Sequence, residues 1–312
     1  MKRKIGFLLI PLSILLFITG CTSKETNSQN KKEFIFGASF NTMNNPHWIK
    51  WSEGLTKVVK NKGDKLIIMD AQDNISKQVS DVEDLVTQQV DAIFIAPADS
   101  QGIKPALEAA QKAKIPVIIM DVPVKDKNLV KATIATDNYL AGQLLAKAMI
   151  KQMNGHAKIG IIDYSTVNAV VERTNGFLGE IKKNPNMKVV SRQEGLGTNE
   201  LGMKVMESFL QSDPDMNAVF AVNDLSGLGA SAAIKAANRN DIKVFGIDGS
   251  EDGFKAIKNG ELIGTSAQFP YKMGTIAAKT AYKIILKEKY ERVTKVPAVW
   301  VDKSNVEKYL KN

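Results

Sequence analysis

Cysteine and histidine are scarce in this chain of 312 residues, which contains one cysteine, Cys21, and two histidines, His47 and His156. A single cysteine cannot form an internal disulfide, so the fold must depend on its hydrophobic core. The two histidines are not spaced for metal ligation, and we expect neither a metal ion nor a cofactor. The sequence also contains no phosphate-binding G-x-x-x-x-G-K-S/T loop and no nucleophile elbow. These absences argue against an enzyme.

Long apolar runs are absent beyond the N-terminal segment. There, Lys2, Arg3 and Lys4 precede an apolar stretch, 5–18, that is too short to span a bilayer as a mature helix. Ile18-Thr19-Gly20-Cys21 follows and supplies the small residues that a signal peptidase needs. This order predicts export from the cytoplasm, which makes ATP, NAD and intracellular DNA poor candidates for partners.

The tetrad that ends at Cys21 resembles the lipobox of bacterial lipoproteins, in which the cysteine is acylated and becomes the new N-terminus. The resemblance implies a signal peptide over 1–20, lipidation at Cys21, and an extracytoplasmic protein anchored to the bacterial cell membrane. Residues 22–32 include no apolar residue, so we predict a disordered tether over 21–33.

Charge gives no sign of a nucleic-acid partner. The net charge is +9, from 42 Lys and Arg against 33 Asp and Glu. The lysines are scattered along the chain rather than clustered, as at Lys57, Lys60 and Lys65, which is typical of a solvated surface. Hydrophobic residues make up 44% of the chain, as in globular proteins, and the length is sufficient for two domains.

Short apolar runs alternate with amphipathic segments along the rest of the chain. Their length and β-branched content are typical of strands buried on both faces. Strands are expected at 34–39, 66–69, 92–96, 117–120, 158–162, 218–222, 244–247 and 263–267. Helices are expected at 49–61, 76–89, 102–113, 139–153, 170–183, 200–211, 226–237 and 271–286. This alternation predicts an α/β fold with parallel sheets.

Polar residues follow the ends of several expected strands. In open α/β sheets ligands bind beyond the carboxyl ends of the strands, so these residues are placed to surround a crevice. Acidic residues at such turns can equally cap the following helix, and Asp224, directly before a helix, is the best candidate for a cap. The strand-end residues are Asp70, Asp121, Asp163, Asn223 with Asp224, and Asp248.

One glycine motif is similar to a dinucleotide-binding loop. Residues 227–232, Gly-Leu-Gly-Ala-Ser-Ala, fit the pattern G-x-G-x-x-A, and Asp248 follows about 20 residues later. The glycines lie several residues beyond the strand end, where we expect helix. Small residues there would let the helix approach its neighbours closely, so we interpret the motif as packing rather than as cofactor binding.

Seven segments, each with at least one polar or charged residue, follow one another along the chain at 41–48, 70–74, 119–121, 172–177, 218–224, 246–249 and 267–268. In this order they resemble the ligand-contacting segments of the ribose-type periplasmic binding proteins, which are the substrate-binding components of sugar ABC transporters. The resemblance extends over nearly all of the chain that follows the signal segment.

The resemblance implies a set of ligand residues that suits a monosaccharide or a related polyol. A carboxylate accepts hydrogen bonds from two hydroxyls, arginine donates in a planar fork, and an amide does both. Aromatic rings, here Trp48 and His47, would cover the apolar face of the sugar. The first domain would supply Asn41, Asn45, His47, Trp48 and Asp121, the second Arg173, Asn223 and Asp248, and the hinge Gln268.

Alternatives stay open at several of these positions. Trp48 could be a core residue of its helix, with Trp51 one turn further on. Asn45 could be only a helix cap. Arg173 could be a surface residue, and His47 could lie at the rim of the cleft.

Two positions depart from the pattern of the ribose binders. Val122 follows Asp121 where ribose binders have an arginine, and Gly197 stands where they have a second aromatic residue. The loss of a charged donor and of a stacking ring argues against ribose itself. Another pentose, a hexose, a cyclic polyol or a furanose signalling molecule stays open.

The fold that the resemblance implies is α/β, with two doubly wound parallel-sheet lobes joined by a three-crossing hinge, as in type I periplasmic binding proteins. The crossings are expected near 135–137, 267–269 and 296–298. The lobes would then be 34–136 plus 269–297 and 137–268 plus 298–312. A bound ligand would close the lobes of a monomer, and the transmembrane subunits of an ABC permease would read the closed form.

Other classes of function stay as alternatives. The same closed lobe pair could dock on a chemoreceptor or a histidine-kinase sensor as a co-receptor, and the sequence alone does not separate this role from import. Sugar-responsive repressors share the fold but begin with a helix-turn-helix, whereas this chain begins with a signal-like segment. An extracytoplasmic enzyme would need a base and a nucleophile in the cleft.

Overall fold

The computed structural model describes Met1 and residues 32–310. The predicted signal peptide, the predicted lipidation site Cys21 and nearly all of the predicted tether lie outside the described residues. Within the described residues, no helix combines the length and the hydrophobicity needed to cross a membrane.

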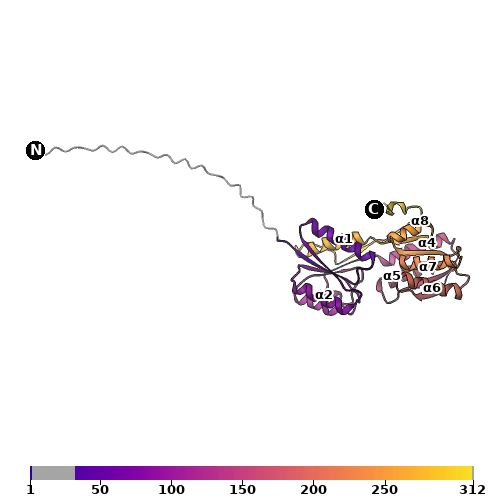
Figure 1. Cartoon of the computed structure of the whole chain (residues 1–312), viewed down its shortest axis with the longest axis horizontal. Coiled ribbons are helices and arrows are strands. Elements are labelled where there is room, and N and C mark those ends of the chain that lie inside the picture. The colour runs from indigo at the N-terminus through magenta and orange to yellow at the C-terminus, as the bar shows by residue number, and fades with distance from the viewer. Residues whose placement is uncertain (2–31, 311–312) are drawn as a thin grey trace. The chain divides into compact units, whose positions relative to one another are not determined.

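Most of the N-terminal strands build one six-stranded sheet, sheet A, together with one strand from near the C-terminus (Figure 1). The order is β11-β5-β4-β3-β1-β2, and neighbouring strands are parallel. Because β1 lies between β2 and β3, the chain winds outward from it in both directions. The strands are β1 (Ile35–Phe40), β2 (Lys65–Asp70), β3 (Ala92–Ala96), β4 (Val117–Met120), β5 (Ala132–Thr136) and β11 (Val293–Val296).

Helices cover both faces of sheet A. Alternate residues of β3 enter the two cores, because side chains of a strand point to opposite faces. Phe94 packs in the core beneath α1 and α9, whereas Ile93 and Ile95 pack in the core beneath α2 and α3. The helices are α1 (Pro46–Asn61), α9 (Pro270–Ile285), α2 (Ile75–Thr87) and α3 (Lys104–Lys112), and a short 3-10 helix, η1 (Lys127–Leu129), follows β4.

A second six-stranded sheet, sheet B, repeats this order as β12-β10-β9-β8-β6-β7. Its strands are parallel except for β12, which pairs antiparallel with β10 at the edge. The strands are β6 (Ala157–Asp163), β7 (Met187–Glu194), β8 (Ala218–Ala221), β9 (Lys243–Asp248), β10 (Gly264–Ala267) and β12 (Val299–Asp302). One face carries α4 (Asn138–Gln152) and α5 (Asn168–Ile181), and the other carries α6 (Asn199–Ser212), α7 (Asp224–Ala236) and α8 (Glu251–Asn259), with α10 (Glu307–Leu310) against α8.

The chain passes between the two sheets in three places. The strand β5 belongs to sheet A, whereas the helix after it, α4, packs on sheet B. The strand β10 belongs to sheet B, whereas α9 packs on sheet A, and the last passage lies between β11 and β12. The passages at 136–138, 267–270 and 296–299 overlap the crossings expected from the sequence.

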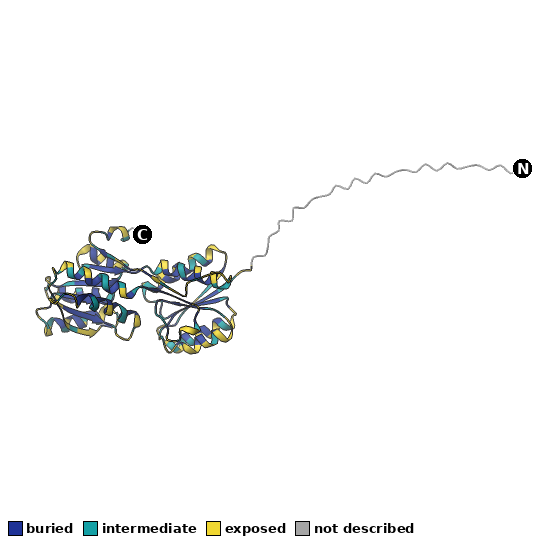
Figure 2. Ribbon diagram, turned by 180° about the vertical axis from the view of Figure 1, so that it is seen from behind, coloured by how far each residue is buried: buried dark blue, intermediate teal, exposed yellow. Residues whose placement is uncertain are grey.

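Burial separates the central strands from the edge strands (Figure 2). The strands β3, β4 and β5 are buried along their whole length. The expectation that residues 66–69 form a strand buried on both faces is wrong, because β2 pairs only with β1 at the edge of sheet A. Ile68 of this strand is 40% exposed.

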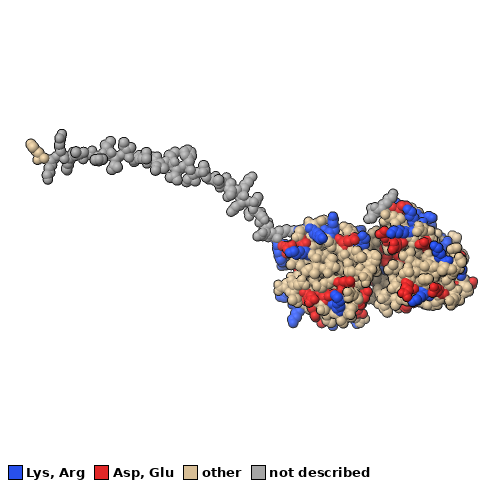
Figure 3. All heavy atoms as spheres, in the orientation of Figure 1, with Lys and Arg blue, Asp and Glu red and all other residues tan. Residues whose placement is uncertain are grey.

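Charged side chains of both signs are interspersed over the face shown in Figure 3. Several pair within one helix, such as Lys204 with Glu200 at 2.6 Å. Exposed pairs of this kind contribute little to stability, so the scattered lysines form a solvated surface.

Candidate functional site

A single cleft is lined by residues that follow the carboxyl ends of strands in both sheets. We call the side that follows β1 to β4 the first wall and the side that follows β6 to β9 the second wall. All of the ligand residues predicted from the sequence line this cleft: Asn41, Asn45, His47, Trp48, Asp121, Arg173, Asn223, Asp248 and Gln268. Their contact with a ligand stays a prediction.

The first wall is built around the start of α1. Asn45 is the N-cap, and its side chain accepts a hydrogen bond from the backbone N–H of His47 at 2.9 Å. Trp48 is 7% exposed, packs against Phe40 in the core and also lines the cleft. Asn45 is therefore a helix cap and Trp48 is a core residue, as the structural alternatives proposed, and both residues also line the cleft.

His47 is fixed by the two tryptophans of α1. Trp48 contacts the imidazole edge-on, and Nε1 of the fully buried Trp51 donates to Nε2 of His47 at 3.1 Å. An indole N–H can only donate, so Nε2 accepts and carries no proton. This hydrogen bond assigns the neutral imidazole with its proton on Nδ1.

Asp121 lies beside His47 with its charge uncompensated. It is 5% exposed, and its Oδ1 has no hydrogen-bond partner among the described residues. Its Oδ2 lies 3.7 Å from Nε2 of His47, so two acceptors face each other. In the same wall Asn41 also has an unpartnered Oδ1, while its amide donates to Asp73 at 3.1 Å. Buried acceptors without donors cost free energy, so this wall is ready to accept hydrogen bonds.

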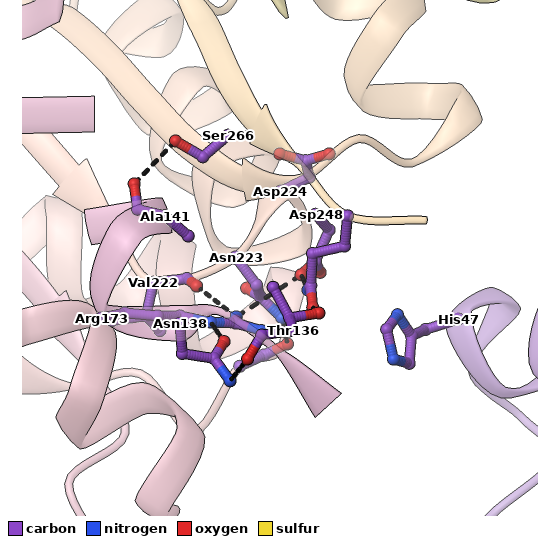
Figure 4. A network of polar contacts seen from close by, with 12 residues as sticks. His47, Thr136, Asn138, Ala141, Arg173, Val222, Asn223, Asp224, Asp248 and Ser266 are labelled. Atoms are coloured by element: carbon purple, nitrogen blue, oxygen red, sulfur yellow. Dashed lines mark hydrogen bonds and ion pairs between the residues drawn. The ribbon is translucent and has the colours of Figure 1, made fainter. Parts of the chain in front are cut away.

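Arg173 of α5 forms the centre of the second wall (Figure 4). It is 6% exposed, so the interpretation of Arg173 as a surface residue is wrong. Its Nε donates to Asn138 at 2.9 Å, and its Nη1 donates to the carbonyl of Val222 at 2.9 Å and to Asp248 at 3.4 Å. The start of α4 and the ends of β8 and β9 therefore hold the guanidinium, and Nη2 takes no part in these bonds.

Asp248 connects the second wall to the crossing residue Gln268. The amide of Gln268 donates to Asp248 at 2.6 Å, and its oxygen accepts from the hydroxyl of Thr136 at 2.5 Å. Thr136 ends β5, so one hydrogen-bond chain joins two of the crossings to the cleft. Burial raises the pKa of Asp248 to about 6, while Arg173 opposes this rise and Asp224 adds to it. At pH 7 the carboxylate is therefore mostly ionised and accepts hydrogen bonds.

Glycines bring α4 and α5 close enough to hold Arg173 at the cleft. A Cβ on Gly142 of α4 would lie 1.9 Å from the backbone oxygen of Arg173. A Cβ on Gly176 of α5 would lie 2.1 Å from the backbone oxygen of Tyr139. Both separations are far below van der Waals contact, so only glycine permits this crossing.

Asn223, rather than Asp224, caps α7. The side chain of Asn223 accepts from the backbone N–H of Ser226 at 2.9 Å and donates to the carbonyl of Gly197 at 2.8 Å. The prediction of Asp224 as the cap is therefore wrong by one residue. Asp224 lies in the first turn, is completely buried and accepts from the hydroxyl of Thr265 at 2.7 Å. Burial raises its pKa.

The dinucleotide-like glycines lie inside α7, as expected. A Cβ on Gly229 would lie 2.0 Å from the backbone oxygen of Asn199 in α6. A Cβ on Gly227 would meet Ala221 and Val244 of sheet B at 3.5 and 3.7 Å. The motif therefore packs α7 against α6 and against the sheet.

Sequence reasoning missed two parts of the second wall. Tyr164 follows β6, and Gly197, with a φ of +69°, leaves room beside it, since a Cβ there would lie 3.5 Å from the tyrosine ring. The start of α5 also lines the cleft, with Val167 as an N-cap that makes no side-chain hydrogen bond. Asp163, a predicted strand end, was the signal for Tyr164. The start of α5 gave no signal, because valine is not a capping residue.

Charge differs between the walls. Asp73, Asp99 and Asp121 line the first wall, and Arg173 is the only Lys or Arg among the described residues that line the cleft. The part of the chain that the structure describes contains no group of three or more His, Cys, Asp or Glu residues suited to a metal ion.

Known proteins are similar to this chain in sequence and in fold. The family model for the periplasmic binding protein domain matches residues 36–289. The ribose import binding protein RbsB of Bacillus subtilis is 36% identical over 304 residues, with 95% of this chain and 98% of the relative covered. A periplasmic solute binding protein of Actinobacillus succinogenes with bound D-allose matches with a TM-score of 0.84 at 29% identity, covering 89% of this chain and 100% of that chain. A solute binding protein of Bacillus halodurans with bound myo-inositol matches with a TM-score of 0.84 at 26% identity, covering 89% and 98%.

The matched domain spans most of the chain, and its two α/β sheets fit the fold of the solved relatives. The relatives are solute-binding proteins of ABC transporters rather than enzymes. The chain therefore belongs to the periplasmic binding proteins, as a ribose-type member of the type I class.

Proposed function

We propose that this chain is an extracytoplasmic sugar-binding lipoprotein that delivers a monosaccharide or a related polyol to an ABC importer. The cleft carries the proposal, because the polar residues that match the family's ligand positions line it from both walls. Relatives named for ribose and for galactofuranose, and structures with bound D-allose and myo-inositol, support a polyhydroxylated ligand.

Hinge closure is the proposed mechanism. We divide the protein at its three crossings into lobes of 34–136 plus 269–297 and 137–268 plus 298–312. A ligand that contacts both walls binds the closed arrangement best, and a shift from mostly open to mostly closed needs about 5.5 kcal/mol of differential affinity. Several charge-assisted hydrogen bonds can supply this. A series of hydrogen bonds connects Thr136 through Gln268 to Asp248. A ligand that binds Asp248 would therefore be coupled to two of the crossings that form the hinge.

The partner is proposed to be the transmembrane part of an ABC permease. Lipidation of Cys21 would keep a monomeric receptor at the membrane surface, within reach of that partner. Two of the relatives are named for import or for a bound sugar, so delivery is favoured over the sensory role.

A thermal-shift screen of the full-length chain, purified from membranes in detergent, tests the proposal. Pentoses, hexoses and cyclic polyols are screened, and a ligand at 100 times its Kd is expected to add about 2.7 kcal/mol of stability. The shift is expected to vanish in Asp121→Ala and Arg173→Ala. Mass spectrometry of the same preparation is expected to find diacylglycerol on Cys21 and none in Cys21→Ser. A folded protein that responds to no carbohydrate contradicts the sugar-binding function.

A further inference from the structure

The two walls of the cleft differ in the hydrogen-bonding groups that they present to a ligand. The first wall presents acceptors: the unpartnered Oδ1 atoms of Asn41 and Asp121, and Oδ2 of Asp121, which lies 3.7 Å from the unprotonated Nε2 of His47. The second wall also contains an acceptor, Asp248, but there Arg173 already compensates the charge, and the wall adds donors from Arg173 and from backbone N–H groups at the uncapped start of α5. A ligand that satisfies both walls therefore places its strongest donor beside Asp121.

Among the acceptors of the first wall, the carboxylate of Asp121 has the strongest need for a hydrogen-bond donor from the ligand. Because Trp51 donates to Nε2, the imidazole has no proton there to give to Asp121, 3.7 Å away. The single lone pair of Nε2 already accepts from Trp51, so His47 offers neither a donor to Asp121 nor an acceptor to the ligand. The carboxylate of Asp121 must therefore find its donors in the ligand. A hydroxyl has one hydrogen to donate, whereas an ammonium group has three, enough for both oxygens of Asp121 at once.

Charge points the same way. Asp248 in the second wall has Arg173 at 3.4 Å and the Gln268 amide at 2.6 Å. Asp121 has no such partner among the described residues, because the residue that follows it into the cleft is the apolar Val122. A buried carboxylate without a cation is stabilised strongly by a positive group placed beside it.

We infer that the ligand of this cleft presents an amine to Asp121, and that the cleft therefore ranks ligands by charge: an amino sugar or amino polyol first, its neutral parent second and its acidic counterpart last. The inference rests on the proposed function. Charge-assisted hydrogen bonds are stronger than neutral ones by enough to give about a tenfold gain in affinity for the amine over its parent.

Isothermal titration of the full-length chain in detergent at pH 7.5 tests this ranking with matched series. Each series consists of a neutral parent (D-glucose, D-galactose, D-ribose or myo-inositol), its monoamino isomers with the amine at each position, and its uronate or phosphate. In a series whose parent binds, one amino isomer is expected to bind about tenfold more tightly and the acid at least about tenfold more weakly. Asp121→Asn should fold, because asparagine tolerates the φ of +62° at this position, and it is expected to abolish the amine's advantage. Val122→Lys is expected to do the same.

Asp248→Asn is the matched control in the other wall: it should weaken parent and amine alike and leave their ratio unchanged. If a parent binds and none of its amino isomers binds more tightly, the inference is overturned and the proposed function stands. An amine advantage that persists in Asp121→Asn also overturns it. If no member of any series binds, the proposed function fails and the inference with it. Nitrogen-15 NMR of His47 gives a separate readout, since a proton on Nε2 in the free protein would provide Asp121 with a donor and contradict the inference.

Discussion

Sheets A and B place the same kind of residue at corresponding points, yet the two walls treat it differently. Asp121 follows β4 in sheet A, and Asp248 ends β9 in sheet B, each with a positive φ, of 62° and 138°. Asp248 is compensated by Arg173 and held by Gln268, whereas Asp121 has one unpartnered oxygen among the described residues. The shared topology places an aspartate at corresponding positions in the cleft. The residues around each aspartate determine whether its carboxylate already has hydrogen-bond donors and a compensating charge within the protein.

The two halves also share a packing device beside the cleft. In one half, a Cβ on Gly54 of α1 would lie 2.2 Å from the backbone oxygen of Tyr271 in α9. In the other, Gly142 meets the backbone of Arg173 in α5. Each pair brings a helix that carries ligand residues to backbone distance from its neighbour, so rigid positioning is common to both walls even though their charges are not.

Removal of Arg173 is expected to have the largest effect. Arg173→Ala leaves Asp248 buried without its cation, which should cost about 3–5 kcal/mol of unfolding free energy and abolish sugar binding. Urea unfolding and titration with the sugar found in the screen measure the two effects separately.

The double variant Arg173→Ala with Asp248→Asn is the control. It removes the unpaired charge, so most of the stability should return while binding stays lost. If Arg173→Ala alone is as stable as the wild type, the interpretation of the second wall as a compensated charge pair is contradicted.

An intermediate effect is expected at the helix crossings. Gly142→Ala forces α4 away from the backbone of Arg173, and overpacking of this kind costs about 1–3 kcal/mol. Gly54→Ala should cost a similar amount in the other half, because its Cβ meets backbone at a comparable distance. The matched control is Gly179→Ala in α5, where the Cβ would meet only the hydroxyl of the exposed Tyr139 side chain, at 3.1 Å.

Thermal unfolding of the three alanine variants checks this comparison. Gly142→Ala is also expected to weaken sugar binding through Arg173, and Gly54→Ala through His47 and Trp48 of α1, whereas Gly179→Ala should leave binding unchanged. Equal stability of Gly179→Ala and Gly142→Ala would contradict the role assigned to the close crossing.

The alternation of apolar runs predicted the α/β class and most central elements, because strands such as β3 and β4 are continuous apolar segments. The strands that it missed lack such segments. The strand β5 is Ala-Thr-Ile-Ala-Thr, β7 is an edge strand with mostly exposed residues, and β11 and β12 are short and partly exposed. Helix α8 was missed as a short segment of nine residues. The structure of these four strands depends on pairing with neighbouring strands that only the folded sheet supplies.

Most of the cleft residues were predictable because they follow strands, and Arg173, which lies within α5, was predictable because it matches a family segment. Their partners were not. The bond from Trp51 to His47 depends on the pitch of α1 and on the rotamers of both rings, and the unpartnered oxygen of Asp121 depends on Val122 standing beside it. Tyr164 lies in the cleft, whereas Gly197 occupies the position at which the resemblance expects an aromatic residue. The ring of Tyr164 lies in the space beside Gly197, and this replacement could not be predicted from sequence position.

The smallest expected effect is a pH dependence that separates the walls. Burial raises the pKa of Asp248 to about 6, above its ordinary value of 3.8. As the pH falls from 7 to 5, Asp248 takes up a proton and ceases to be a charged acceptor, so sugar affinity should weaken by up to about tenfold. The stability contribution has the opposite sign. Between pH 3.8 and about 6 the folded state binds a proton that the unfolded state does not, so this group stabilises the ligand-free protein more as the pH falls through that window.

Titration with the sugar and urea unfolding at pH 5, 6, 7 and 8 measure the two trends. In Asp248→Asn both should flatten over this range, apart from the contribution of the other carboxylates. We assign this pH dependence to the second wall, because burial raises the pKa of Asp248 there. A wild-type affinity that stays constant from pH 7 to pH 5 would show that the ligand does not use Asp248 as a charged acceptor. The first wall, with the unpartnered Asp121, would then carry the recognition alone.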